Sequence, residues 1–332
     1  MKRKISWVYI LAVLTALPLV GTVAPAATIE VLRTFDFPGE GNATLPQKIS
    51  DQGVIVGTVI DVNGAEKGFF YKPRIRRFSD EGFTAPNDTG NVTRGRGINN
   101  QRHACGEYLN GSAVTFHGYI LEHPNFIAFD VTDTLDTIPL GINNVGDVVG
   151  TVILSDARQP AFLSLRGSVT TFEVPDATAT LAYQLNTSNQ IAGYYVDPSG
   201  VTHGYTRDQL GNLTFPIDAP GSTGTLLLGN NDLNWGVGRY TDASGATHGL
   251  FFITPDNILT FDYPGSTFTS LNGINKQGFI CGYYLDAAGI FHGIWAKLHL
   301  NGASKPNTNI PVAPVKPAQS SPEMLRTGAP AL

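Results

Sequence analysis

Histidine recurs at one position of a repeated pattern, and imidazole is a side chain well suited to binding a metal or moving a proton near neutral pH. The members each precede a glycine: His117, His203, His248 and His292. A zinc site needs several ligands within about 2.1 Å of one ion, whereas equivalent positions of a repeat lie one per unit. We therefore expect no metal site, and expect each imidazole to hydrogen-bond inside its own unit, to turn residues such as Asp197, Asp242 or Asp286.

Carboxylates repeat in two further patterns. One group follows a phenylalanine: Asp36, Asp130, Glu173 and Asp262. The other opens Asp-x-x-Gly turns: Asp61–Gly64, Asp197–Gly200, Asp242–Gly245 and Asp286–Gly289. A pair of carboxylates can hydrolyse glycosides and a dense cluster can bind calcium, but catalysis needs two distinct environments and calcium needs several oxygens. Both patterns therefore predict structural roles. The sequence contains no nucleophile elbow, suggestive Cys-His pair or phosphate loop, so we expect no cofactor.

Basic residues that break the repeat are better candidates for a binding site. Arg94 and Arg96 are expected just before the first strand of the second unit, on a long connection, and Arg102 replaces the glycine found at Gly146 and Gly278. A separate turn holds Lys72, Arg74, Arg76 and Arg77. Together they predict a basic patch that binds a carboxylate or an anionic glycan. An ordinary solvated surface is the alternative.

These residues must be positioned by a repeated framework. A glycine after a short apolar stretch recurs about every 44 residues, at Gly57, Gly106, Gly150, Gly193, Gly238 and Gly282. In the last unit, residues 271–275, 279–285 and 291–295 are predicted strands separated by tight turns, and residues 259–264 supply a fourth strand type. Four short antiparallel strands in such a period are typical of a β-propeller blade.

The ends of the repeat region predict how the ring closes. The region opens with a lone fourth-type strand, 31–37, and stops after a third-type strand, 291–297. Pairing them completes the last blade and removes two exposed edges. We therefore predict an all-β fold, a six-bladed β-propeller of four-stranded antiparallel blades over residues 30–298. A β-solenoid or open repeat stack, the alternative, would leave both strands unpaired.

The repeated segments resemble those of the bacterial extracellular HAF-repeat proteins. The resemblance rests on Gly-Ile-Asn-Asn-x-Gly segments followed by His-Gly-Phe-like and Thr-Phe-Asp-x-Pro segments, and it covers about residues 30–298. The family is named for His-Ala-Phe, whereas this chain mostly has glycine second; one unit reads Pro160-Ala161-Phe162 and another reads Lys67-Gly68-Phe69. The resemblance implies secretion and a repeat fold, and it implies no reaction.

The chain ends and the cysteines complete the predicted organisation. Residues 1–26 read as a signal peptide, with basic residues before an apolar run and small residues for cleavage; a membrane anchor is the alternative. Residues 299–332 are rich in Pro, Ala and Ser and predict a disordered tail. Cys105 and Cys281 each precede a repeat glycine, so we expect free buried thiols. The protein is expected to be secreted or periplasmic, without stable membrane insertion after cleavage.

Composition narrows the function without naming it. The formal net charge is −5, which argues against nucleic acid as a partner. We expect a non-enzymatic binding or structural module whose partner is an anionic glycan or another extracytoplasmic protein. The alternative is a secreted carbohydrate-active hydrolase or lyase with a site at the channel mouth. Non-equivalent polar residues converging there, with a carboxylate or histidine of displaced pKa, would favour the enzyme, whereas a channel plugged by repeated apolar residues would oppose it.

Overall fold

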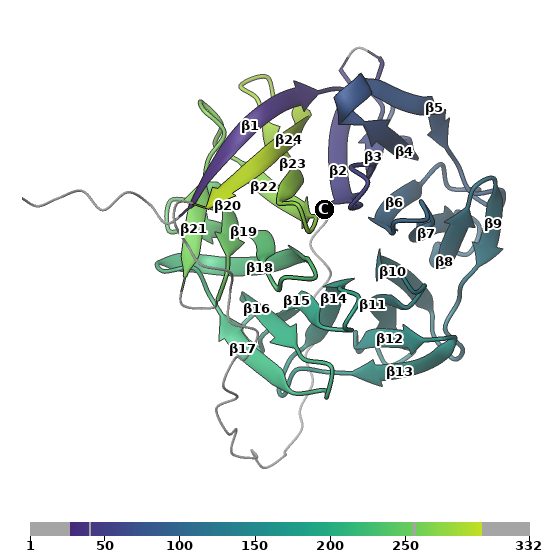
Figure 1. Ribbon diagram of the computed structural model, residues 1–332. Coiled ribbons are helices and arrows are strands. Elements are labelled where there is room, and N and C mark those ends of the chain that lie inside the picture. Colours follow the sequence, from purple (N-terminus) through teal and green to yellow (C-terminus); the bar gives the residue numbers. More distant parts are fainter. Residues whose placement is uncertain (1–26, 40, 255–256, 301–332) are drawn as a thin grey trace, which may run out of the picture.

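The computed structural model describes residues 27–39, 41–254 and 257–300, and these form a six-bladed β-propeller. Six four-stranded antiparallel sheets surround a central axis, with the first strand of each blade innermost (Figure 1). The predicted fold class is therefore confirmed. The predicted signal peptide, and the predicted tail from residue 301 onward, lie outside the described residues.

The blades follow one another along the chain. Blade one contains β2 (Ala43–Ile49), β3 (Ile55–Ile60), β4 (Glu66–Lys72), the short 3-10 helix η1 (Pro73–Ile75) and β5 (Arg77–Phe83). Blade two contains β6 (Thr93–Ile98), β7 (Ala104–Asn110), β8 (Thr115–Glu122) and β9 (Asn125–Ala128). Blade three contains β10 (Asp136–Ile142), β11 (Val148–Ile153), β12 (Ala161–Leu165) and β13 (Ser168–Phe172). Blade four contains β14 (Ala179–Leu185), β15 (Ile191–Val196), β16 (Thr202–Arg207) and β17 (Leu213–Ile217).

The last two blades complete the ring. Blade five contains β18 (Ser222–Asn230), β19 (Gly236–Asp242), β20 (Thr247–Phe252) and β21 (Ile258–Phe261). Blade six contains β22 (Thr269–Ile274), β23 (Phe279–Leu285), β24 (Phe291–Leu300) and β1 (Ala27–Phe35). Strands β1 and β24 lie side by side and antiparallel, from the Ala27–Leu300 pair to the Phe35–Gly293 pair (Figure 1). The predicted closure is confirmed. Strand β1 starts before the predicted residue 31 and ends before the predicted residue 37, while β24 continues past residue 297 to Leu300, so residues 299–300 belong to the propeller and not to the predicted tail. Each strand supplies the other with a hydrogen-bonding partner.

The repeated glycine is required by the close approach of two strands. A Cβ at Gly106 would collide with the backbone carbonyl of Arg94, and a Cβ at Gly150 would collide with the carbonyl of Ile138. The other repeat glycines face an inner-strand carbonyl in the same way, and the pairing register shifts just beyond each of them. Any larger residue would force the inner strand away, so each blade requires a glycine at this bulged pair. The glycine therefore recurs once per blade.

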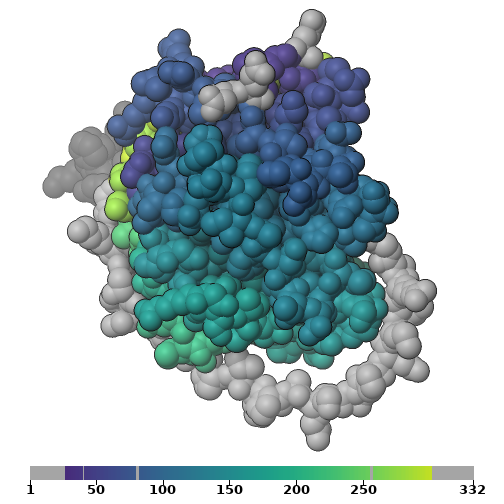
Figure 2. Space-filling model, turned by 90° about the vertical axis from the view of Figure 1, so that its right-hand side faces the viewer, coloured from purple at the N-terminus to yellow at the C-terminus, as the bar shows by residue number. Residues whose placement is uncertain are grey.

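The disc has two ends of different chemistry. We call the end with the turns between the first and second strands of each blade the Asn face; its turns are residues 50–54, 99–103, 143–147, 186–190, 231–235 and 275–279. The opposite end, the Asp face, carries the turns between second and third strands, at residues 61–65, 110–114, 154–158, 197–201, 242–246 and 286–290. Between these ends the blades pack directly against one another along the rim (Figure 2).

Candidate functional site

A repeated asparagine joins neighbouring blades at the Asn face. In blade three, Asn143 Oδ1 accepts the backbone N–H groups of Val145 and Asp147 at 3.0 and 2.9 Å, and Asn143 Nδ2 donates to the carbonyl of Asn186 in blade four at 3.3 Å. The same interblade bond is made by Asn99, Asn143, Asn186, Asn231 and Asn275. The first asparagine of the Gly-Ile-Asn-Asn motif is therefore a structural lock.

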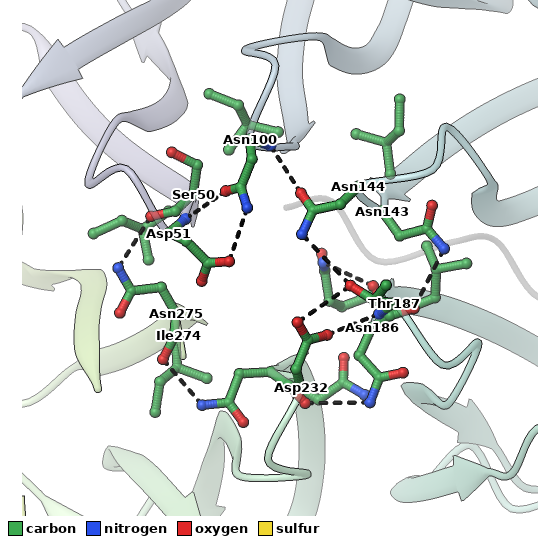
Figure 3. Close-up of a pocket in the computed structure, with 17 residues that line it drawn as sticks. Ser50, Asp51, Asn100, Asn143, Asn144, Asn186, Thr187, Asp232, Ile274 and Asn275 are labelled. Atoms are coloured by element: carbon green, nitrogen blue, oxygen red, sulfur yellow. Dashed lines mark hydrogen bonds between the residues drawn. The ribbon is translucent and has the colours of Figure 1, made fainter. Parts of the chain in front are cut away.

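The residue at the next position of each turn varies among the blades, and all of these residues except Lys276 line a hollow on the axis. The set comprises Asp51, Asn100, Asn144, Thr187, Asp232 and Lys276. Asn100 Nδ2 donates to Asp51 Oδ2 at 2.9 Å, and Thr187 Oγ1 donates to Asp232 Oδ2 at 3.2 Å. The hollow that they surround, which we call the axial hollow, has a volume of about 50 Å³ (Figure 3). Polar side chains of several types therefore converge at the channel mouth from equivalent turn positions.

Below this mouth the channel is crossed by a buried lysine. Lys48, at 4% exposure, donates from Nζ to the carbonyl of Leu228 in blade five at 2.7 Å and lies 5.3 Å from the Tyr183 ring centroid in blade four. Burial lowers the Lys48 pKa to about 7, although Cys281 and Cys105 act in the opposite direction. An unrepeated polar group therefore crosses the channel at this level, whereas the lining of the axial hollow includes the repeated aliphatic residues Ile49, Ile98, Ile142, Leu185 and Ile274.

The two cysteines pack beside this lysine as free, fully buried thiols, as predicted. Burial raises the pKa of both Cys105 and Cys281 to about 12. A thiol held in its protonated form is a weak nucleophile, so the two side chains act as small core residues.

Two of the predicted binding arginines lie elsewhere than predicted. Arg94 and Arg96 belong to β6 itself, not to the connection before it. Arg94 makes a bidentate ion pair with Glu66 of blade one, at 2.6 and 2.7 Å, while Arg96 pairs with the buried Glu107 at 2.6 Å. Burial opposes the charge on Arg96, but Glu107 outweighs burial and raises the Arg96 pKa. Both guanidinium groups therefore have internal counter-charges: Arg94 braces blade two against blade one, whereas Arg96 is paired within blade two.

The third predicted arginine does lie in a basic pocket. Arg102, from the β6–β7 turn, shares a pocket with Lys72 and Arg74, which flank the β4–η1 junction of blade one. The pocket has a volume of about 310 Å³, and its remaining lining residues are Gln52, Gly53, Val54 and Ile75. The predicted juxtaposition of the blade-one turn with Arg102 is therefore confirmed, although Arg76 and Arg77 do not line this pocket.

The surroundings of this basic pocket add positive charge. Its lining includes no acidic residue. The Arg74 guanidinium lies 5.4 Å from the Phe279 ring centroid, and Lys297 Nζ lies 4.4 Å from the same centroid. Burial, with a smaller effect of Arg74, lowers the Lys297 pKa. Cations from blades one, two and six therefore converge at this edge of the Asn face.

The repeated histidines hydrogen-bond within their blades, as predicted. His248 Nδ1 lies 2.8 Å from Asp262 and Nε2 lies 3.2 Å from the turn residue Asp242, while the ring stacks on Tyr240 at 4.9 Å. Burial disfavours the charged ring, but the hydrogen bonds that Asp262 and Asp242 accept from it outweigh burial and raise the His248 pKa. Related His–Asp contacts occur at His117, His203 and His292. We call these units His–Asp clamps; those at Asp242 and Asp286 match the predicted turn partners.

The aspartates of the Asp-x-x-Gly turns form the turns themselves. Asp197 Oδ1, for example, accepts the backbone N–H groups of Ser199 and Val201, both at 2.8 Å. Among residues 27–39, 41–254 and 257–300, no three His, Cys, Asp or Glu side chains are grouped as a metal-ligand set. Within the same ranges, no helix is long and apolar enough to cross a membrane.

Comparisons with known proteins support the fold. No family model matches the chain, and no curated protein matches its sequence. A mutant of the Aleuria aurantia lectin in complex with alpha-methyl-L-fucoside is 8% identical over 82% of this chain and 96% of that chain, with a TM-score of 0.50. A lectin from Burkholderia pseudomallei is 9% identical over 74% and 78%, with a TM-score of 0.43. The β-propeller domain of the Trilobed protease from Pyrococcus furiosus is 9% identical over 79% and 100%, with a TM-score of 0.43.

Proposed function

We propose that this protein is an extracytoplasmic, non-enzymatic binding module of the HAF-repeat type that holds an anionic glycan in the basic pocket. The supporting observation is the convergence of Lys72, Arg74 and Arg102 from two blades on one pocket without an acidic residue. Guanidinium groups bind carboxylates and sulfates in a bidentate manner, which suits uronic acids and sulfated sugars.

The volumes of the two pockets favour the basic pocket, rather than the axial hollow, as the ligand site. Pockets for small organic ligands usually have volumes of about 300–1,000 Å³. The basic pocket, at about 310 Å³, reaches that range, whereas the axial hollow, at about 50 Å³, does not. One sugar unit therefore fits the basic pocket, and the remaining units would extend over the Asn face.

A secreted hydrolase or lyase at the channel mouth is the second candidate. Asp51 and Asp232, two carboxylates in non-equivalent surroundings at this mouth, are the observation that favours it. Both carboxylates already accept hydrogen bonds from neighbouring turns, and the axial hollow is too small for a sugar ring. The binding module is the better supported function.

A glycan array with the purified protein tests the proposal. We expect retention of uronic-acid or sulfated glycans and no retention of their neutral counterparts. The Lys72→Ala, Arg74→Ala, Arg102→Ala triple variant should lose at least about tenfold in affinity, since each charge-assisted contact contributes about 1.5–3 kcal/mol.

Arg166→Ala is a matched control, because Arg166 is an exposed arginine of the β12–β13 turn, at the same end of blade three but outside the pocket. This variant should bind as the wild type does. Equal loss in both variants would indicate a diffuse charge effect, and binding of neutral glycans alone would refute the proposal. Turnover of any bound glycan, abolished in Asp51→Asn or Asp232→Asn, would instead support the hydrolase or lyase.

A further inference from the structure

Two cations meet beside the basic pocket, where blade six adjoins blade one (Figure 1). Lys297 of β24 and Arg74 of η1 both approach the Phe279 ring, with Lys297 Nζ 4.4 Å and Arg74 Cζ 5.4 Å from the ring centroid. Trp295 stacks on the same ring at a centroid distance of 5.4 Å and an interplanar angle of 16°. One aromatic ring therefore holds two cations from different blades near each other.

The described carboxylates do not neutralise these two cations. Ion pairs among the side chains that the structure describes include neither Arg74 nor Lys297. Glu30, which lies opposite Lys297 in the β1–β24 ladder, has its carboxylate 2.8 Å from His299 Nε2. Lys297 Nζ donates to the carbonyl of Gln277, which leaves further N–H groups for a ligand. Neighbouring cations repel each other, and an anion bound between them removes this repulsion.

Arg74 connects this pair of cations to the basic pocket. It lines the pocket, and it also lies against the Phe279 ring beside Lys297. Its segment is tied to blade six, because Arg33 of β1 donates from Nη1 to the carbonyl of Pro73 at 3.3 Å. An anion in the pocket and a second anion at Lys297 would therefore both contact one guanidinium group, whose N–H groups point in several directions.

We propose that Arg74 and Lys297 form a second anion subsite, so that the protein selects a polyanionic glycan with acidic groups on neighbouring sugar units. This subsite rests on the proposed function of the basic pocket. The first acidic group lies in the basic pocket and the next lies between Arg74 and Lys297, so the glycan runs from blade two across blade one to blade six. A glycan with a single acidic sugar occupies the basic pocket alone.

Calorimetric titration with a pair of tetrasaccharides tests the proposal. One carries a uronic acid at every position, and the other carries a single terminal uronic acid on neutral sugars. We expect the wild type to bind the fully acidic glycan at least about fivefold more tightly, because it also contacts the second subsite. Lys297→Gln should weaken the binding of this glycan about five- to tenfold and leave the binding of the other unchanged. Lys297→Arg, which keeps the charge, should bind both within about threefold of the wild type.

Lys276→Gln is the matched control, because Lys276 is a lysine of the same blade and face whose Nζ lies 3.5 Å from Asp51. It should bind both tetrasaccharides as the wild type does. Equal affinity of the wild type for the two glycans, or an equal effect of Lys297→Gln on both, would overturn the second subsite and leave the basic pocket standing. The wild-type comparison decides alone if Lys297→Gln does not fold. Absence of binding by either glycan would instead overturn the proposed function, and the second subsite with it.

Discussion

The two ends of this propeller use the same repeat in opposite ways. At the Asp face, the His–Asp clamps repeat with nearly the same contacts and lie near the surface; the Asp262 side chain is 49% exposed. At the Asn face, one repeated asparagine locks the blades, and beside it lie groups that occur once, such as the buried Lys48 and Arg102 of the basic pocket. The difference teaches that repetition identifies structural residues, whereas departures from the repeat identify the candidate site.

The largest expected effect comes from the buried lysine. The Lys48 pKa is lowered to about 7 in the folded protein, whereas an unfolded lysine titrates near 10.5. Between these values only the unfolded state binds the extra proton, so the free energy of unfolding should rise with pH. We compare wild type with Lys48→Met by urea unfolding at pH 7 and pH 10. The free energy of unfolding should rise between these two pH values by on the order of 4 kcal/mol more in the wild type than in the variant. Parallel curves for the two proteins would show that Lys48 is charged when folded.

The asparagine lock should give the next largest effect. Asn186 is 4% exposed, and its side chain accepts two backbone N–H groups and donates to the carbonyl of Asn231 in the next blade. Asn186→Ala leaves these groups unpaired and should lower the free energy of unfolding by about 2–3 kcal/mol, measured by urea titration. The control is Asn144→Ala, because Asn144 follows the locking Asn143 in the turn of blade three. This substitution should lower the free energy of unfolding by less than about 1 kcal/mol. Equal costs would contradict a locking role.

Substitutions in the His–Asp clamps of the Asp face should give the smallest change in the free energy of unfolding. The stabilisation by the clamps should decrease as pH rises, opposite to the trend predicted for Lys48. The His248 pKa is raised above its usual 6.5, so the stabilisation by its two aspartates is complete below pH 6.5 and is lost as pH rises through the folded-state pKa. Because the partners are partly exposed, His248→Ala should cost below about 1 kcal/mol at pH 5.5 and less at pH 8. A larger cost at pH 8 than at pH 5.5, in thermal unfolding, would refute this sign.

Most of the fold could be predicted because its causes are local and repeated. The glycine at each bulged pair and the asparagine of each turn appear in nearly every unit, so one unit identifies the others. The position of Arg94 and Arg96 could not be found in the same way. Their strand reads Thr-Arg-Gly-Arg-Gly, which lacks the apolar residues typical of a strand, and its charges are satisfied by Glu66 and Glu107 on neighbouring strands.

One sequence signal for this brace did exist. Glu107 follows a repeat glycine, where blades one and three have Thr58 and Thr151. A carboxylate at a buried position of the repeat requires a cation nearby, and the arginines of the paired strand were available.

The central claim is that the departures from the repeat on the Asn face form the binding site. A crystal structure of the protein with a sulfated or uronic-acid oligosaccharide tests this most directly. The account predicts an acidic sugar group between Lys72, Arg74 and Arg102, with the His–Asp clamps unchanged. A glycan bound at the Asp face, against the repeated clamps, would contradict it.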